Sequence, residues 1–514
     1  MTETVKLRST RLDDLLVQGL THSADAVVLS GLGTELTGSE VISRARGLAD
    51  ELRNAGVRAG EPVLLPVDNN PQDVVCQLAA WLAGCVPIPV HRPFPASVAA
   101  DVAARAAARV ALGHVPSAWT EVVASTPGAS VQRVLGGQDH IVPPVEINAD
   151  QALVVFTSGS TGRPKGVVIS HHAFATKLAA IDRVLDFRAG ARMLQVLHLH
   201  FSFGQWTTLL TLASGGRVDL VQRFSAIEVL DRLAGTTYDR IAVVPTMMRM
   251  MATVLSAPSS GQLLDMHRQS GSPRLWIAGG EPLPAGLGRH FREMMPKSDI
   301  ADVFGLSETA TSDCILRPED YDGHAGTIGR PSPGVSVRVV CETPDGFQDA
   351  GVGKPGELWI RTPHLMTGYL GDPDATAQTM TQDWLRTGDL AQIEADGYVT
   401  LVGRAKNLIV RGGAKISPLE VEHVFSAYPG CSGAIAVGIA DDVLGERIHL
   451  VMSARPDHEI DAADVREWGR SHIEHHKLPD RVHIVDDFPL GGTGKTDRTA
   501  TAQIVQNLLE AESE

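Results

Sequence analysis

The chain has 514 residues, of which 45 are Lys or Arg and 60 are Asp or Glu, so its formal net charge at pH 7 is −15. Hydrophobic residues make up 43% and charged residues 20%, which excludes a disordered chain. The acidic balance also argues against a broad surface for nucleic acid or anionic membranes, so we expect neither as a partner.

Cysteine usage and the apolar stretches indicate a cytoplasmic protein. The cysteines are odd in number and none form a CxxC pair, which argues against a disulfide framework or a zinc–thiolate site. They are Cys76, Cys85, Cys314, Cys341 and Cys431. The N-terminus shows no signal peptide. The most apolar stretch, 74–90, contains Gln77 and is interrupted by Pro87 and Pro89, so it is too short to cross a bilayer.

The first 150 residues alternate between helical and strand-like patterns. Helical spacing predicts a helix over 39–55 with Ser39 as its N-cap. A buried strand over 61–67 and a helix over 73–83 follow, and the Ala- and Arg-rich stretch 96–110 predicts a surface helix. This alternation predicts a mainly parallel sheet covered by helices.

The pattern of predicted strands and helices changes twice further along the chain. The strand–loop–helix pattern runs from 152 to about 303, and short alternating segments after Gly326 predict a small antiparallel β unit. From Lys406 onward, strands and a helix over 418–426 predict a compact α+β tail. We expect an α/β fold. Its large N-terminal domain, 1–403, has helix-covered β-sheets and a small β-barrel-like unit, and a small mobile α+β C-terminal domain, 404–514, follows.

A loop rich in glycine and hydroxyl groups spans Phe156 to Gly166 and follows an apolar strand pattern. Such a loop suits a polyphosphate, because backbone N–H groups and hydroxyls surround the oxygens while Lys165 offsets their charge. It is not a P-loop, since Pro164 and Gly166 stand where that motif needs Gly and Ser or Thr. The alternative is a flexible surface loop. A second Gly-rich loop near the C-terminus carries Lys495.

Three further segments complete an ordered pattern. They read AGGE at 278–281, VFGLSE at 303–308, and WLRTGDL at 384–390 leading into GRAKN at 403–407. Together with the two loops, their order and spacing resemble the adenylate-forming superfamily, which includes acyl-CoA synthetases, peptide-synthetase adenylation domains and firefly luciferase. The resemblance covers nearly the whole chain.

The resemblance implies a site for ATP and Mg²⁺. Phe304 would stack on adenine, Ser307 would touch the α-phosphate, and Glu308 would bind Mg²⁺, which prefers carboxylate and phosphate oxygens. Asp389 would accept the ribose hydroxyls, with Arg404 nearby. The remaining nucleotide-binding residues implied are Thr157, Ser158, Gly159, Ser160, Thr161, Gly162, Lys165, Gly279, Gly280 and Glu281.

The resemblance implies two half-reactions, and the C-terminal tail would supply different residues to each of them. Lys495 would bridge the substrate carboxylate and the α-phosphate, two anions that repel unless cations offset their charge. Lys406 stands at the hinge position. Gly412 and Gly413 would line the tunnel for a thiol, either CoA or the phosphopantetheine of a separate acyl or peptidyl carrier protein.

The acyl pocket is expected around the segment LHLHFSFGQW at 197–206. His200 is the preferred gating residue and Phe201 the next choice, while the alternative is a strand with hydrogen-bonded core histidines. Trp276 is expected to form a flat wall, with core packing as its alternative. The other pocket residues expected are His198, Ser202, Gly204, Ala242, Ala278, Val303, Thr311 and Ser312.

The substrate class follows from a missing charge. No Asp or Glu lies between Met193 and Val218, and an α-ammonium buried without a counter-charge would be costly. An aryl or medium-sized acyl acid is therefore favoured over an amino acid. The predicted activity is ATP-dependent formation of acyl-AMP and pyrophosphate, followed by transfer to a thiol. The alternatives are transfer to a non-thiol nucleophile, a nucleotide-binding homologue without turnover, and luciferase-type oxygenation, which would need an oxygen-reactive substrate.

Overall fold

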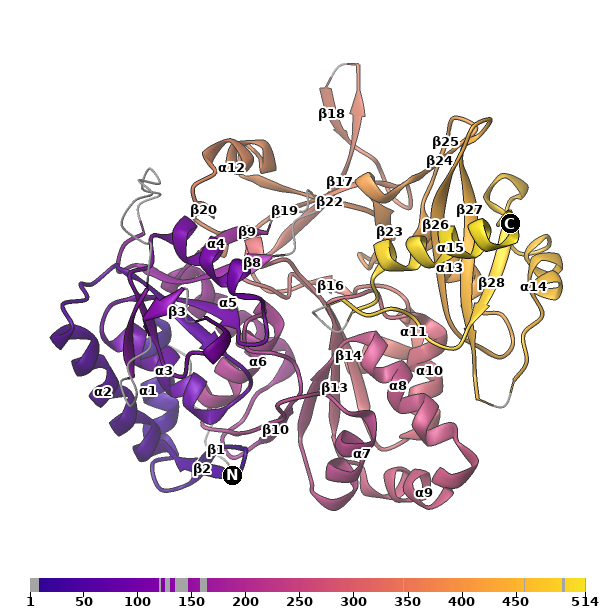
Figure 1. Cartoon of the computed structure of the whole chain (residues 1–514). Helices are drawn as coiled ribbons and strands as arrows, with labels where there is room; N and C mark the ends of the chain where they lie inside the picture. Colours follow the sequence, from indigo (N-terminus) through magenta and orange to yellow (C-terminus); the bar gives the residue numbers. More distant parts are fainter. Residues whose placement is uncertain are drawn as a thin grey trace.

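The computed structural model describes residues 9–119, 122–124, 130–134, 147–157, 164–344, 346–456, 458–491 and 495–513. Figure 1 shows a large N-terminal part, coloured indigo to orange, and a smaller C-terminal part in yellow beside it. The described helices of the N-terminal part are α1 (Leu12–His22), α2 (Gly38–Asn54), α3 (Pro71–Leu82), α4 (Ala96–Ala106), α5 (His171–Leu185), α6 (Ser202–Ala213), α7 (Ala226–Gly235), α8 (Pro245–Ser256), α9 (Gly261–Ser270), α10 (Ala285–Met294), α11 (Tyr321–His324) and α12 (Pro373–Thr379).

Several helix ends differ from the sequence-based expectation, and two of these differences have a clear local cause. The N-cap of α2 is Thr37, not Ser39: its side chain accepts from the N–H of Glu40, and the Glu40 carboxylate accepts from the N–H of Thr37. This capping box satisfies two otherwise unpaired N–H groups. The helix expected over 96–110 ends at Ala106, because Ala107 adopts a left-handed conformation (φ 52°), and residue 110 already belongs to a strand.

A nine-stranded sheet forms the centre of the N-terminal part. Its order is β16-β15-β14-β13-β12-β10-β11-β1-β2, parallel in the middle and antiparallel at both edges. The strands are β1 (Val27–Gly31), β2 (Thr34–Thr37), β10 (Arg192–Gln195), β11 (Arg217–Leu220), β12 (Arg240–Val243), β13 (Leu275–Gly279), β14 (Asp299–Phe304), β15 (Cys314–Leu316) and β16 (Arg330–Pro331). Parallel strands end at one edge, so the loops after β10, β13 and β14 gather there.

Two smaller sheets lie against this centre. The first has the order β4-β3-β5-β7-β6 and the second the order β20-β9-β8. Their strands are β3 (Pro62–Val67), β4 (Val86–His91), β5 (Val110–Leu112), β6 (Val123–Ala124), β7 (Val131–Val134), β8 (Gln151–Thr157), β9 (Lys165–Ser170) and β20 (Gly368–Tyr369). Strand β3 is parallel to β4 and β5, whereas β8 and β9 form an antiparallel hairpin around the first Gly-rich loop.

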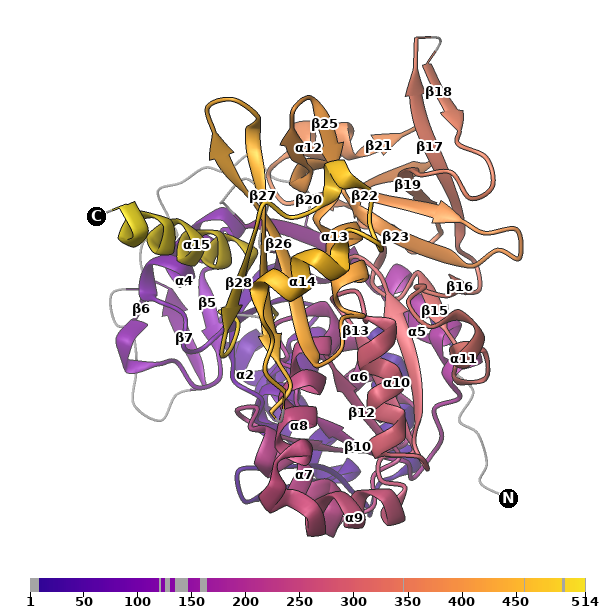
Figure 2. The ribbon, with the colours of Figure 1, turned by 90° about the vertical axis from the view of Figure 1, so that its right-hand side faces the viewer.

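The predicted β unit is a six-stranded antiparallel sheet, which lies in the upper right of Figure 2. Its strands are β17 (Ser336–Thr343), β18 (Gly346–Asp349), β19 (Gly356–Arg361), β21 (Met380–Thr381), β22 (Trp384–Ile393) and β23 (Val399–Arg404). The C-terminal part then packs three helices on a five-stranded sheet. It comprises β24 (Ile409–Arg411), β25 (Ala414–Ile416), α13 (Pro418–Phe425), β26 (Cys431–Asp441), β27 (Gly445–Ala454), α14 (Ala462–Gly469), β28 (Arg481–Val485) and α15 (Arg498–Ser513). The predicted α/β architecture is confirmed.

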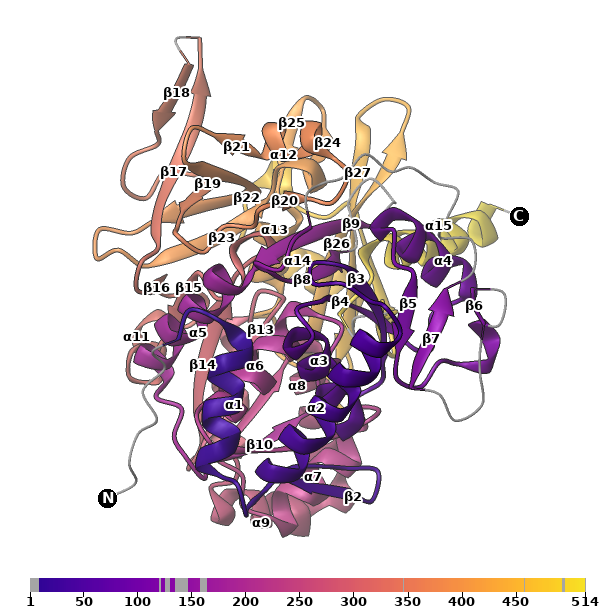
Figure 3. The ribbon, with the colours of Figure 1, turned by 90° about the vertical axis from the view of Figure 1, so that its left-hand side faces the viewer.

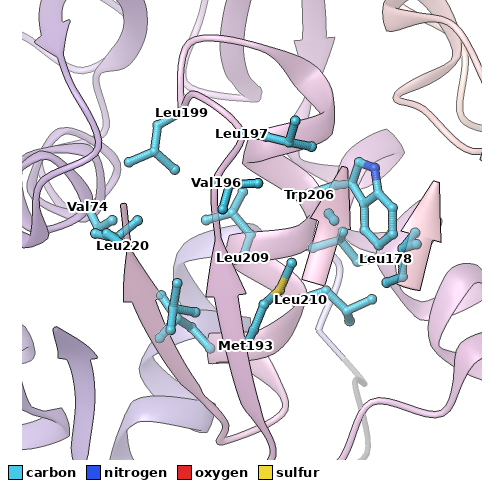
Figure 4. Packing of buried hydrophobic residues seen from close by; sticks show 14 of the residues in the cluster. Val74, Leu178, Met193, Val196, Leu197, Leu199, Trp206, Leu209, Leu210 and Leu220 are labelled. Carbon is cyan, nitrogen blue, oxygen red and sulfur yellow. The ribbon is translucent and has the colours of Figure 1, made fainter. Parts of the chain in front are cut away.

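The principal core lies between the nine-stranded sheet and the helices that cover it, as Figure 3 shows for α1, α2 and α3. Figure 4 shows how the chain leaves β10 through this core, with Leu197 and Leu199 embedded and Trp206 of α6 fully buried. The loop that follows β10 is therefore anchored by apolar side chains on both sides. Within the described ranges, no helix has the length and apolar character needed to cross a membrane.

Candidate active site

The ends of β9, β20 and the turn after β14 bring three polar side chains together. The Lys165 ammonium lies 4.6 Å from the centre of the Tyr369 ring, and the Tyr369 hydroxyl donates to Oε1 of Glu308 over 2.7 Å. Thr157 stands opposite Lys165 in the β8–β9 hairpin. The other loop residues predicted to hold phosphates, Ser158, Gly159, Ser160, Thr161 and Gly162, lie outside the described residues. Tyr369 was not foreseen, because no motif marked it.

The loop between β14 and β15 is held in an unusual backbone conformation. Three successive residues have positive φ, namely Ala310 (56°), Thr311 (93°) and Ser312 (41°). Gly305 makes this possible, since a Cβ there would lie 2.0 Å from the Ser312 nitrogen. Conformations of this kind cost about 1–3 kcal/mol each and persist only where the surroundings enforce them. The turn therefore presents its polar residues in one fixed arrangement.

A buried ion pair enforces that arrangement. Lys177 of α5 donates to Oδ1 of Asp313 over 2.8 Å, and neither side chain is exposed to solvent. Asp313 also accepts from the Thr309 hydroxyl and the Leu306 N–H. Burial raises the pKa of Asp313, although Lys177 opposes that shift. Neither Lys177 nor Asp313 carried a sequence signal.

Asp389 and Arg404 form the predicted pair on neighbouring strands. They face each other in the register of β22 and β23, and Arg404 Nε donates to Asp389 Oδ1 over 2.6 Å. Asp389 is 3% exposed, and burial raises its pKa against the effect of Arg404. Lys406 follows in an exposed turn, Ala405–Asn407. A fixed carboxylate beside a cation can accept hydroxyl hydrogen bonds from a sugar.

The C-terminal part delivers Lys495 to the edge of the central sheet. Gly280 has φ 81°, and a Cβ there would lie 3.1 Å from Cε of Lys495, so a larger residue would press against this side chain. Glu281 secures the approach: its Oε1 accepts from the Thr496 N–H over 2.8 Å and its Oε2 from the Thr246 hydroxyl over 2.9 Å. Burial lowers the pKa of Lys495, while Glu281 opposes that shift.

The two glycines predicted for thiol passage lie elsewhere on the C-terminal part. Gly412 (φ 57°) and Gly413 (φ 82°) form the exposed turn between β24 and β25, near the top of Figure 1. Apart from its chain neighbours, no atom of the described residues lies within 4 Å of a Cβ placed on Gly413. This structure thus brings Lys495, but not the glycine turn, to Gly280 and Glu281.

The predicted gating segment is a loop, not a strand. His198 and His200 lie between β10 and α6, where His200 is 4% exposed and its ring stacks on His91 with 4.6 Å between centroids. Among the described residues, neither nitrogen of His200 nor Nδ1 of His198 has a hydrogen-bond partner. The alternative of hydrogen-bonded histidines on a strand is therefore wrong. Burial, together with His91, lowers the pKa of His198 to about 4.

Some of the other residues predicted for the pocket lie in the loops at the end of the central sheet, and others lie in the core. Ser202 lies 2.7 Å from Ser307, Oγ to Oγ, which joins the start of α6 to the turn after β14. Trp276 is fully buried and meets Phe291 of α10 edge-on at 4.8 Å, a contact that matches its core-packing alternative. The pairing of β12 with β13 and of β13 with β14 places the remaining small or apolar residues, Ala242, Ala278 and Val303, in the sheet, and Gly204 lies close to the His198 carbonyl.

Comparisons with known proteins agree with this geometry. The model of the AMP-binding enzyme family matches residues 18–370, and that of the AMP-binding enzyme C-terminal domain matches residues 420–495. A feruloyl-CoA synthase from Amycolatopsis sp. is 30% identical over 497 residues, which cover 95% of this chain and 98% of that protein.

Solved structures show the same fold. An anthranilate CoA ligase, AuaEII, in complex with anthranoyl-AMP is 22% identical with a TM-score of 0.82, covering 96% of this chain and 97% of the other. The amide bond synthetase McbA from Marinactinospora thermotolerans is 24% identical with a TM-score of 0.81, covering 96% and 99%. The chain belongs to the AMP-binding enzyme family and is a ligase of the adenylate-forming superfamily.

Proposed function

We propose that this enzyme activates a carboxylic acid with ATP and then transfers the acyl group to the thiol of CoA. In the first step, a carboxylate oxygen attacks the α-phosphorus, the bond to pyrophosphate breaks, and acyl-AMP forms. The observation that carries the proposal is the placement of the partly buried Lys495 side chain against Gly280. A cation held there offsets the two negative charges that must meet.

The other site residues suit ATP and Mg²⁺. Asp389, fixed by Arg404, would accept the ribose hydroxyls, and Phe304 at the end of β14 would face the adenine. Tyr369 occupies Oε1 of Glu308 and orients its carboxylate, a hard oxygen ligand of the kind that Mg²⁺ prefers. Glu308 and the phosphates of ATP would hold the ion, which would neutralise part of the phosphate charge when bound.

The second step needs a different face of the C-terminal part. The thiol attacks the acyl carbon, and the bond to AMP breaks. Gly412 and Gly413 would line the passage for pantetheine after a rotation about Lys406, between domains spanning 1–403 and 404–514. The synthase from Amycolatopsis, similar along almost its whole length, is named for transfer to CoA. A separate carrier protein bearing phosphopantetheine is the other thiol donor to test.

For the substrate, we infer an aryl or medium-sized acyl acid. The chain segment between Met193 and Val218 contributes no acidic residue to pair an α-ammonium. One relative is named a feruloyl-CoA synthase, and one structural neighbour was solved in complex with anthranoyl-AMP. Both feruloyl and anthranoyl are aromatic acyl groups.

Pyrophosphate release across benzoate-like, cinnamate-like, medium-chain and proteinogenic amino acids, with and without CoA, tests both inferences. We expect aryl or medium-chain acids to be fastest and CoA to yield a thioester. The highest rate with an α-amino acid would overturn the substrate inference. Acyl-AMP consumed by amines but not by CoA or a carrier thiol would overturn thiol transfer.

A further inference from the structure

Three histidines converge at the junction of β4 with the loop that follows β10. His91 ends β4, whereas His198 and His200 lie in that loop. One ring nitrogen from each residue lies within 4.8 Å of the corresponding nitrogen of the other two. The rings are also in contact, since His91 lies 4.4 Å from His198 and 4.6 Å from His200 between centroids.

The nitrogens of this cluster lack hydrogen-bond partners among the described residues. They are Nε2 of His91, Nδ1 of His198, and both nitrogens of His200, whose side chain is almost fully buried. A buried polar atom left unpaired costs about 1–3 kcal/mol. His198 and His200 thus carry nitrogens that no described side chain satisfies, and Nε2 of His91 has only the Asp68 carboxylate at 3.5 Å, so the cluster favours a ligand that takes nitrogen lone pairs.

The backbone on both sides of the cluster is fixed. Asn69 donates to the carbonyls of Leu197 and Val221 and accepts from the N–H of Leu199. Leu197 and Leu199 extend into the apolar core (Figure 4), and they alternate with the two histidines. The loop thus has two embedded leucines, and its histidines are held beside His91.

An acidic group completes the set. Oδ1 of Asp68 lies 3.5 Å from Nε2 of His91, and Gln222 donates to Oδ2 of the same carboxylate over 2.8 Å. We propose that His91, His198 and His200 bind a divalent transition metal, with Zn²⁺ as the reference ion, and that Asp68 offsets its charge as fourth ligand or as partner of His91. Imidazole suits Zn²⁺, while Mg²⁺ prefers oxygen.

Metal binding requires the rings to turn as well as to approach one another. Tetrahedral Zn²⁺ with Zn–N bonds of about 2.0–2.1 Å places its nitrogens about 3.4 Å apart. The nitrogens now lie within 4.8 Å of one another, and the rings of His91 and His200 are stacked with 11° between their planes, so at least one of the two must rotate to aim its lone pair at the ion. His91 and His198 are partly exposed to solvent, whereas His200 is buried. Bound there, the metal pins the loop that leads into Ser202, which contacts Ser307. This site includes His198 and His200, which the sequence assigns to the acyl pocket, and it does not involve Glu308, the residue proposed for Mg²⁺.

The test uses full-length protein without a polyhistidine tag, stripped by a chelator and reloaded with Zn²⁺ in the presence of excess Mg²⁺. Elemental analysis after gel filtration should find about one zinc per chain, and Zn²⁺ should raise the melting temperature. X-ray absorption at the zinc edge should count about three imidazoles, and Co²⁺ should give the visible spectrum of a tetrahedral site.

Variants locate the site. His91→Phe and His200→Phe keep a ring for stacking but remove the nitrogens, and each should weaken Zn²⁺ binding by at least about 100-fold. Asp68→Asn should weaken it roughly 10–100-fold, as outer partners do. The exposed pair His475→Ala/His476→Ala is the matched control and should bind as the wild type does.

The outcomes separate clearly. Wild-type protein that retains no zinc, zinc bound without imidazole, or equal loss in the surface control would overturn the proposal. If the Phe variants fail to fold, the imidazole count on wild-type protein and the Asp68→Asn affinity decide the matter.

Discussion

At the residue scale, Lys495 is the group whose position most directly implies chemistry. Replacing it by Ala should slow acyl-AMP formation by on the order of 10²-fold or more, because one preorganised charge is lost where charge develops. Thiolysis of supplied acyl-AMP should change much less. Rapid-quench measurement of each half-reaction checks this, and equal loss in both would count against a C-terminal part that carries Lys495 away between steps.

Tyr369 makes a second prediction at this scale. Its hydroxyl orients Glu308 and its ring faces the Lys165 ammonium. Tyr369→Phe keeps the ring but frees the carboxylate, so the Mg²⁺ concentration for half-maximal adenylation should rise several-fold while the maximal rate changes little. Titration of adenylation with Mg²⁺ measures this shift. An unchanged Mg²⁺ dependence would show that Tyr369 does not position Glu308.

At the scale of elements, the turn between β14 and β15 depends on the ion pair that joins it to α5. Lys177→Met leaves the Asp313 carboxylate buried without a counter-charge, which should destabilise the N-terminal part by about 3–5 kcal/mol. Urea unfolding followed by tryptophan fluorescence measures the change.

The double variant Lys177→Met/Asp313→Leu is the control for this prediction. With both charges removed, it should recover much of the lost stability, since no unpaired charge remains. It should still bind ATP less well, because the three residues with positive φ lose the contact that holds them. A double variant less stable than Lys177→Met would mean that the pair is not the cause.

At the scale of the whole molecule, the proposed function needs two arrangements of the N- and C-terminal parts, and the structure shows one of them. Lys495 lies at Gly280, whereas Gly412 and Gly413 lie in an exposed turn. We predict that Lys406→Pro leaves acyl-AMP formation measurable but strongly slows thioester formation, because proline fixes φ at the position proposed as the pivot. Lys406→Ala, the control, should change both steps modestly. Normal thioester formation by the Pro variant would place the pivot elsewhere.

The sequence by itself was sufficient for the family and the fold class. Each motif is a short run of neighbouring residues, so it can be recognised without knowing how the chain packs. Examples are the glycine and hydroxyl loop before Lys165 and the Gly-Gly-Glu run at 279–281. Alternating and helical patterns located most elements for the same local reason. The N-cap Thr37 was readable in principle, because Glu40 stands three residues beyond it.

Contacts between distant residues were decided by the tertiary structure alone. Tyr369 meets Glu308 across 61 positions and Lys177 meets Asp313 across 136, and nothing in either local sequence marks the partner. His198 and His200 were recognised as a pair, but their meeting with His91 depends on how β4 packs against the loop after β10. Neighbouring residues specify the local helices, strands and turns. Contacts between remote residues form only when the chain packs, and that packing decides whether a buried polar atom finds a hydrogen-bond partner.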